Sequence, residues 1–139
     1  MSNWYNNVRD FHAAFGQRIG TTPAIPEDVD ERCLRMDLLE EEFREYMDAE
    51  QKLDIVGIAD ALADIIYIAC GTAVSYGIPL DKVFEEVHRS NMSKLVDGKV
   101  IRREDGKILK PKGWTPPQIE TILEEAIEKN NLLNQQITL

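Results

Sequence analysis

The sequence is poor in the residues that build disulfide frameworks and soft-ligand metal sites. It has two cysteines, Cys33 and Cys70, and two histidines, His12 and His88, among 139 residues. The cysteines are too few for a disulfide scaffold and lack CxxC spacing, which is typical of a protein kept in a reducing cytoplasm. The first residues lack the basic and apolar stretches of a secretory leader, so we expect a cytoplasmic protein. The longest uncharged run, 65–80, is too short to span a bilayer well.

Positive charge is also scarce. The chain has 16 lysine and arginine residues against 25 aspartate and glutamate residues, a net charge of −9. We therefore expect neither a nucleic acid polymer nor a membrane as a partner. The charges are divided, since residues 27–60 carry 13 acidic and 4 basic side chains, whereas residues 88–112 carry 8 basic and 3 acidic ones. A metal-bound polyphosphate needs both signs of charge at once, although clustering on solvated faces would give the same pattern.

Hydrophobic periodicity predicts an all-α protein with one domain over residues 1–139. The spacing of apolar residues indicates helices over about 4–15, 27–49, 54–76 and 80–94, and a last helix that starts at Thr115-Pro116-Pro117. The turn pairs Asp97-Gly98 and Asp105-Gly106 predict a loop or small hairpin. The residues after about Asn130 are expected to fray. The expected fold is a bundle of about four to five helices with a short basic loop or hairpin before the last helix.

A cluster of glutamates lies in the second predicted helix. At about 100° per residue, Glu41, Glu42 and Glu45 share one face, whereas Glu40 points away from them. The main apolar face of this helix is elsewhere and contains Val29, Cys33, Met36, Leu39, Phe43, Tyr46 and Met47. Two leucines continue the carboxylate stripe upstream, so we expect the helix to pack on two sides. The alternative is a solvated glutamate face.

The third predicted helix carries an aspartate pair. Asp60 and Asp64 lie four residues apart on one face and are the only charged residues from Ile55 to Leu80. Burying two like charges is costly unless a cation compensates them. Mg²⁺ prefers hard oxygen ligands, and helical bundles build such sites from carboxylates on neighbouring helices. The lack of a Glu-x-x-His pattern favours Mg²⁺ or Mn²⁺ over iron, and a polar stripe facing water is the alternative.

Basic side chains that could bind phosphate lie in the fourth predicted helix and in the segment after it. Continuing the apolar stripe of this helix places Asn91 and Lys94 on its core-facing side. Lysine binds phosphate readily, and Lys110 is a weaker candidate further along the chain. Trp114 could stack on a base. The alternative is a solubilising loop that Trp114 anchors by packing.

Two motifs and three further stretches carry a family resemblance. Glu41-Glu42-Phe43-Arg44-Glu45 looks like an EExxE motif, and Asp60-Ala61-Leu62-Ala63-Asp64 looks like the second motif of the same group. The stretches 69–79, 87–95 and 105–117 are similar to small proteins of that group from bacteria and phages. The sequence thus resembles the MazG-like superfamily of all-α nucleoside triphosphate pyrophosphohydrolases, which includes dimeric all-α dUTPases and phosphoribosyl-ATP pyrophosphohydrolase. Ala61 stands where the family motif has Glu, and Asp60 is the carboxylate able to replace it.

The resemblance implies a MazG-like bundle that hydrolyses a nucleoside or deoxynucleoside triphosphate to the monophosphate and pyrophosphate. The expected cofactor is Mg²⁺, with Mn²⁺ as a substitute, and the expected role is nucleotide-pool house-cleaning. Glu41 would position or deprotonate the attacking water. The metal ligands would be Glu42, Glu45, Asp60 and Asp64. The substrate-binding residues would be Asn91, Lys94, Lys110 and Trp114.

Two other functions stay open at this point. One is a pyrophosphatase restricted to dUTP or a modified nucleotide, and the other is a non-catalytic dimerisation module whose carboxylates bind a structural cation. Phosphoribosyl-ATP is a less favoured substrate, because the resemblance is closest to the MazG-like branch with a basic tail. The second and third helices have more apolar surface than one chain can cover, which predicts a homodimer or homotetramer, in line with the resemblance.

Overall fold

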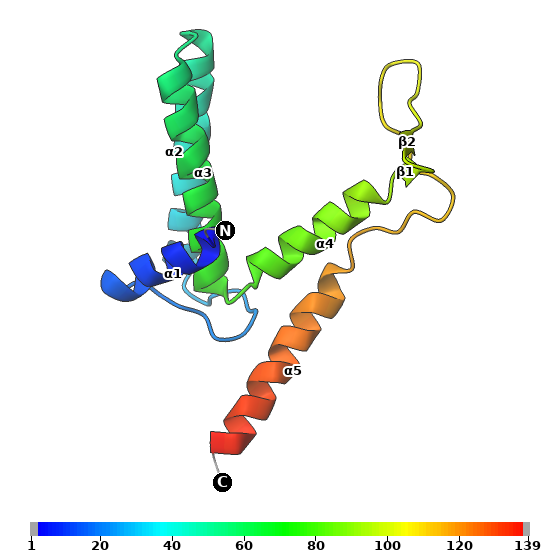
Figure 1. Cartoon of the computed structure of the whole chain (residues 1–139). Coiled ribbons are helices and arrows are strands. Elements are labelled where there is room, and N and C mark those ends of the chain that lie inside the picture. Colours follow the sequence, from blue (N-terminus) through cyan, green and yellow to red (C-terminus); the bar gives the residue numbers. More distant parts are fainter. Residues whose placement is uncertain (1–2, 138–139) are drawn as a thin grey trace. The chain divides into compact units, whose positions relative to one another are not determined.

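The computed structural model describes residues 3–137 of the chain (Figure 1). These residues form five helices and one short hairpin, which loops connect. In chain order the elements are α1 (Trp4–Ala14), α2 (Val29–Gln51), α3 (Ile55–Tyr76), α4 (Leu80–Met92), β1 (Leu95–Val96), β2 (Lys99–Val100) and α5 (Ile119–Ile137). The predicted all-α fold is confirmed. The chain divides into two compact units, one ending at Pro79 and the other beginning at Leu80. One domain over residues 1–139 stays a prediction.

Local capping sets the ends of α2 and α3, which form an antiparallel pair. Asp28 precedes α2, and its side chain accepts hydrogen bonds from backbone N–H groups of the first turn. Asp54 precedes α3 and accepts from the N–H of Gly57 at 3.1 Å. α3 ends at Gly77, whose φ of 68° suits glycine. Only residues 52–54 link the two helices, so they lie side by side (Figure 1).

The side of α2 that packs against α3 is not its apolar stripe. Arg35 and Ala49 are buried there, and Leu38 and Glu42 are half-buried. These four residues share one face because they follow one another at intervals of three, four and seven. The predicted apolar stripe is uncovered in the single chain, with exposed side chains at Val29, Cys33, Met36, Leu39, Phe43 and Met47.

α3 is the central helix of the first unit, because it packs against both α1 and α2. Its second half contains the fully buried Val74, and α1 contributes the buried Val8 and His12. Its first half is less covered, since Ile55 is 74% exposed and Val56 is 75% exposed. By length and composition α3 could also cross a membrane. The core helix of a helical bundle has the same properties, so they do not assign α3 to a membrane.

A hydrogen-bond network joins α4 to the start of α5 in the second unit. The Nε1–H of Trp114 donates to the carbonyl oxygen of Ser90 at 2.9 Å. The hydroxyl of Ser90 in turn donates to the carbonyl oxygen of Thr115 at 2.9 Å. The backbone N–H of Gln118 donates to Glu86 Oε1 at 3.0 Å. These bonds fix the segment that leads from the hairpin into α5.

The hairpin was predicted better than the end of α5. Asp97 and Gly98 both have positive φ, 50° and 72°, which is the two-residue turn that an Asp-Gly pair favours. α5 continues to Ile137, so the prediction of fraying after Asn130 is wrong. The leucines and glutamines after the asparagine pair are good helix formers and sustain the helix.

The first testable prediction concerns Glu86. Hydrogen bonds from Arg89 and then from the N–H of Gln118 lower the pKa of Glu86 to about 2. A lowered pKa stabilises the folded state above the ordinary pKa of 4.5, and this contribution is lost as the pH falls toward about 2. Glu86→Gln should therefore lower the melting temperature at pH 7, and its difference from wild type should close in acid.

Thermal unfolding followed by circular dichroism between pH 2 and pH 7 would measure this difference. Glu85→Gln is the matched control, because Glu85 is exposed on the same helix and has no ion pair among the described residues. Equal melting temperatures of Glu86→Gln and wild type at pH 7 would contradict the prediction.

Candidate functional site

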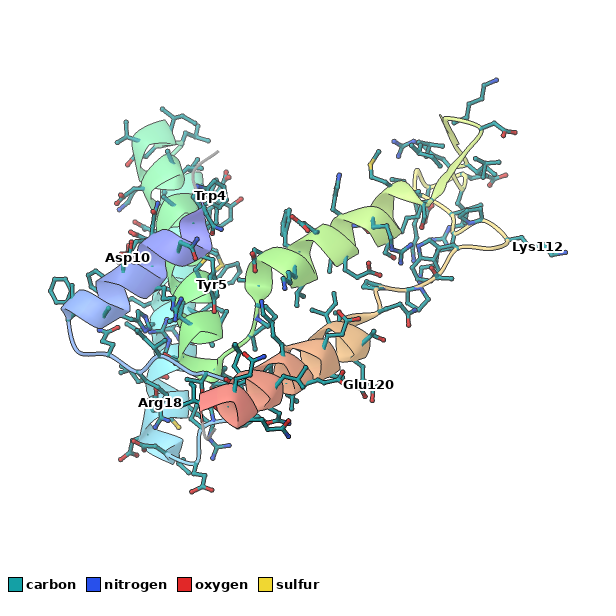
Figure 2. The ribbon with its side chains drawn as sticks, turned by 60° about the horizontal axis from the view of Figure 1, so that its bottom comes forward. Trp4, Tyr5, Asp10, Arg18, Lys112 and Glu120 are labelled. Atoms are coloured by element: carbon teal, nitrogen blue, oxygen red, sulfur yellow. The ribbon has the colours of Figure 1, made fainter. Side chains whose placement is uncertain are left out.

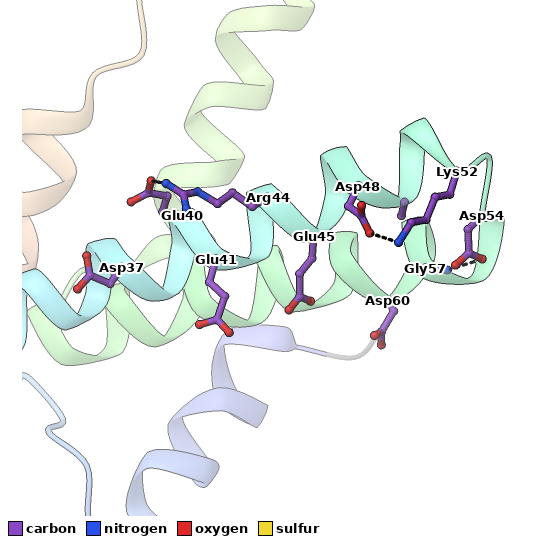
Figure 3. A pocket seen from close by; sticks show the side chains of 11 residues that line it. Asp37, Glu40, Glu41, Arg44, Glu45, Asp48, Lys52, Asp54, Gly57 and Asp60 are labelled. Carbon is purple, nitrogen blue, oxygen red and sulfur yellow. Dashed lines mark hydrogen bonds and ion pairs between the residues drawn. The ribbon is translucent and has the colours of Figure 1, made fainter.

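An acidic cleft of about 680 Å³ runs along α2 and the beginning of α3 (Figure 3). Seven of its 11 lining residues are aspartate or glutamate, and two, Arg44 and Lys52, are basic. Both basic side chains form ion pairs with carboxylates of α2, Arg44 with Glu40 and Lys52, just after the helix, with Asp48. The remaining carboxylates therefore dominate the electrostatics of the cleft.

Three predicted site residues project into this cleft. Glu41 and Glu45 come from α2 and Asp60 comes from α3, and Figure 3 shows their carboxylates pointing to the same side of the helix pair. All three are exposed, and none forms an ion pair within the described part of the chain. Glu40 turns away toward Arg44, as the helical spacing predicted. An open cleft with three uncompensated carboxylates attracts cations.

The other two predicted carboxylates lie deeper between α2 and α3. Glu42 and Asp64 are half-buried, and Glu42 Oε2 is a buried oxygen with no hydrogen-bond partner. Burial raises the pKa of Glu42, and the negative charges of Asp64, Glu45 and Glu41 raise it further. The charge of Glu42 is thus opposed by carboxylates from both helices.

The donor set of these residues fits a hard divalent cation. No three carboxylate, imidazole or thiol groups between residues 3 and 137 are already arranged as a metal site. Like charges without a cation repel one another, so separated carboxylates are expected. The orphaned oxygen of Glu42, and oxygen as the only donor element offered, match the preference of Mg²⁺. The metal-ligand roles stay a prediction.

The predicted substrate-binding residues all lie in the second unit. Lys94 Nζ donates to Asn91 Oδ1 at 3.0 Å. Lys110 Nζ lies 4.5 Å from the centroid of the Trp114 ring, a cation–π distance. The bond from Trp114 to Ser90 is the anchoring contact named as the alternative for this residue. Figure 2 shows the side chain of Lys112 extending outward from the same basic loop.

One buried polar residue near the carboxylates was missed by the sequence reasoning. Arg35 of α2 reaches across to α3, where it donates to the carbonyl oxygen of Ile68 at 2.8 Å. The available signal was its position seven residues before Glu42, which places both side chains on the same face. A charged residue on a charged helix is ordinarily solvated, so the signal was too weak to use.

Two comparisons with known proteins bear on this site. The family model described as phosphoribosyl-ATP pyrophosphohydrolase matches residues 8–91, more than half of the chain and all five carboxylates. A curated protein of Acanthamoeba polyphaga mimivirus, described as uncharacterized, is 34% identical over 80 residues, which cover 55% of this chain and 32% of that protein. The chain therefore spans about a third of the length of the curated relative it matches.

The second testable prediction follows from the crowding of Glu42. A raised pKa means that ionised Glu42 destabilises the folded state above that pKa, and that protonation relieves the cost as the pH falls. Glu42→Gln should therefore melt at a higher temperature than wild type at pH 7 in EDTA. The difference should shrink toward the ordinary pKa of 4.5, where wild-type Glu42 also becomes neutral.

Glu40→Gln is the matched control for thermal unfolding. It removes a carboxylate two positions away that already pairs with Arg44, so it should give no rise. A lower melting temperature of Glu42→Gln than of wild type at pH 7 would show that Glu42 is not under repulsion.

Proposed function

The chain belongs to the phosphoribosyl-ATP pyrophosphohydrolase family, part of the MazG-like superfamily, and we propose that it is a Mg²⁺-dependent pyrophosphohydrolase of nucleoside or deoxynucleoside triphosphates that serves nucleotide-pool house-cleaning. Family membership supports pyrophosphohydrolase activity on nucleotides in general. The metal and the substrate belong to the proposal. The observation that carries them is the orphaned, buried oxygen of Glu42 among the carboxylates of two helices.

The proposed metal ligands are Glu42, Glu45, Asp60 and Asp64. Bound Mg²⁺ would neutralise triphosphate oxygens and favour in-line displacement at the α-phosphorus. Glu41 is exposed in the cleft and would accept a proton from the attacking water. The oxygen of that water forms a bond to the α-phosphorus while the bond to the bridging oxygen breaks, which releases pyrophosphate.

Cations of the second unit are the proposed partners of the leaving group. Lys94 and Lys110 would compensate the negative charge on pyrophosphate, and Asn91 would bond to a phosphate or sugar oxygen. Trp114 would contact the base. Lys94 and Asn91 already lie together through their hydrogen bond, which supports a joint role for them.

A homodimer or homotetramer is the proposed assembly. The stripe of α2 that does not face α3 is exposed, with Met36 at 63% and Phe43 at 51%. α3 adds Leu62 at 46% and Ile66 at 38%. Exposed apolar surface of this kind usually marks an interface, and two copies of one helix face can pair about a two-fold axis. The proposed location of the protein is the cytoplasm, and the proposal includes neither a nucleic acid polymer nor a membrane as a partner.

The third testable prediction concerns the site residues. Purified protein would be incubated with MgCl2 and a panel of NTPs, dNTPs, dUTP and phosphoribosyl-ATP, and the released pyrophosphate would be measured. Asp64→Asn and Glu45→Gln should each reduce turnover to background, because a neutral isostere keeps the shape but loses the charge that binds the cation. Glu40→Gln should keep most of the activity.

The outcome of this panel also separates the other candidate functions. Turnover of one nucleotide alone would favour a restricted pyrophosphatase, and wild-type turnover in Asp64→Asn would refute the site. If folded wild-type protein turned over no member of the panel, the result would favour the non-catalytic dimerisation module.

The fourth testable prediction concerns assembly. Light scattering at micromolar concentration should give at least twice the 15.9 kDa chain mass. Phe43→Glu should lower that mass by placing a charge in the apolar stripe of α2. Arg9→Gln, an exposed change on α1, should leave it unchanged.

Subunit mixing tests whether one site uses two chains. Activity recovered by mixing Asp64→Asn with Lys94→Ala chains would show that the two residues serve a site from different copies. A 15.9 kDa species for wild type would refute the assembly itself.

A further inference from the structure

Three layers join α2 to α3 at regular intervals. Arg35 meets α3 at Gly71, and Ala49 meets Gly57. Glu42 and Asp64 each lie seven residues from both contacts on their own helix, so the antiparallel register places them at one level. The α2 members are seven residues apart, which is two helical turns or roughly 10.5 Å. Because the paired residue numbers fall on one helix as they rise on the other, the three layers belong to a single antiparallel register.

The first layer is a directional clamp. Arg35 is 9% exposed, its Nε donates to Thr72 Oγ1 at 3.0 Å, and its Nη2 donates to the carbonyl oxygen of Ile68 at 2.8 Å. Thr72 Oγ1 also donates to that carbonyl oxygen at 3.1 Å. A guanidinium holds its donors in a rigid fork, so both bonds are satisfied at one axial position of the helices.

The chain leaves room for this clamp at Gly71. A Cβ added there would lie 2.4 Å from Arg35 Nη2 and 3.2 Å from His12 Nε2. Any side chain at this position would therefore displace the guanidinium. Glycine costs helical stability in the interior of α3, which makes its presence here informative.

The third layer fixes the opposite end of the helix pair. A Cβ added to Gly57 would lie 3.1 Å from the Cβ of Ala49 and 2.6 Å from Asp54 Oδ2. The helices thus approach closely beside the short link of residues 52–54. The middle layer, Glu42 and Asp64, lies between these two fixed points.

The interaction between Glu42 and Asp64 does not itself stabilise the register of the two helices. The two carboxylates repel each other, and the apolar stripe of α2 does not face α3. The largest apolar stripe of α2 therefore does not set the register at this level. A slip of α2 by one turn, roughly 5.4 Å, would break both Arg35 bonds and separate the carboxylates.

We propose that Arg35 is a positioning residue that locks the register of α2 on α3 and so keeps Glu42 opposite Asp64. The role in metal binding rests on the proposed function, whereas the register lock does not. Arg35 acts through the backbone of α3 and makes no contact with the reacting groups.

Arg35→Met in the full-length chain tests this role. Methionine fills the same space, and Ile68 keeps its bond from Thr72, so no acceptor is orphaned. Burial disfavours the charged guanidinium and lowers the pKa of Arg35, and a neutral side chain removes that cost. The melting temperature in EDTA should therefore stay at or above that of wild type. The MgCl2 concentration that gives half of the Mg²⁺-induced rise should increase roughly 10-fold or more.

A second measurement reports the register without metal or substrate. Spin labels at Glu40→Cys and Ala63→Cys, both exposed positions, would be introduced in a Cys33→Ser background and diluted with unlabelled chain. The distance distribution between α2 and α3 should broaden in Arg35→Met. Arg35→Lys, with one donor group in place of a fork, should fall between Arg35→Met and wild type in both measurements.

Arg9→Gln is the control, because it removes the same charge from an exposed site on α1 and should behave as wild type. If Arg35→Met does not fold, Thr72→Val keeps the charge and removes one acceptor, and it should give smaller changes in the same direction. Unchanged Mg²⁺ response and unchanged label distances in a folded variant would overturn the proposal.

The proposed function and the register lock are refuted by different results. A wild-type protein that neither turns over nucleotides nor responds to MgCl2 would refute the proposed function. The label distances in metal-free protein would still decide whether Arg35 locks the register.

Discussion

The repulsion between carboxylates on α2 and α3 is the constraint on which the first unit depends. Glu42 is half-buried beside Asp64 and Glu45, and one of its oxygens has no hydrogen-bond partner. An unpaired buried charge opposes the packing of the two helices. The pair is held instead by features on either side: the bonds of Arg35 at one end, and the close approach of Ala49 to Gly57 at the other. The contacts that hold the two helices together thus lie on either side of the carboxylates and leave them in place.

This constraint also explains which face of α2 is left open. A helix pair in a small unit ordinarily buries the largest apolar stripe of each helix. Here α2 turns a face with Arg35, Leu38, Glu42 and Ala49 toward α3 and leaves Phe43 exposed with its apolar neighbours. A helix that must bring carboxylates to its partner inside the chain cannot cover its apolar stripe on the same partner. Because α2 turns the face with Glu42 toward α3, it brings the carboxylates of the candidate site together. For the same reason its apolar stripe stays exposed and is available to the proposed oligomer.

Features set by contacts between residues close in sequence could be predicted, whereas features set by contacts between distant residues could not. Asp54 and Gly77 bound α3 through contacts within a few residues, so the predicted limits of this helix, about 54–76, agree with the structure. The limits predicted for the second helix, about 27–49, lie two residues before the observed Val29–Gln51. Periodicity also grouped the carboxylates by face, but it does not say which face meets which neighbour. Arg35 remained hidden for that reason, because its partners are more than 30 residues away and one of them is a backbone oxygen.

The family match divides the proposed site in a way that bears on the substrate. The matched range, 8–91, contains the five carboxylates and Asn91, whereas Lys94, Lys110 and Trp114 lie beyond it. The proposed chemistry at the α-phosphorus would use only the first group, and it would be common to every nucleotide that can release pyrophosphate. Selection among such nucleotides depends on contacts to the base, the sugar and the leaving group. The residues proposed for most of these contacts stand outside the match, so the family description supports the reaction type for this chain more strongly than it supports phosphoribosyl-ATP as its substrate.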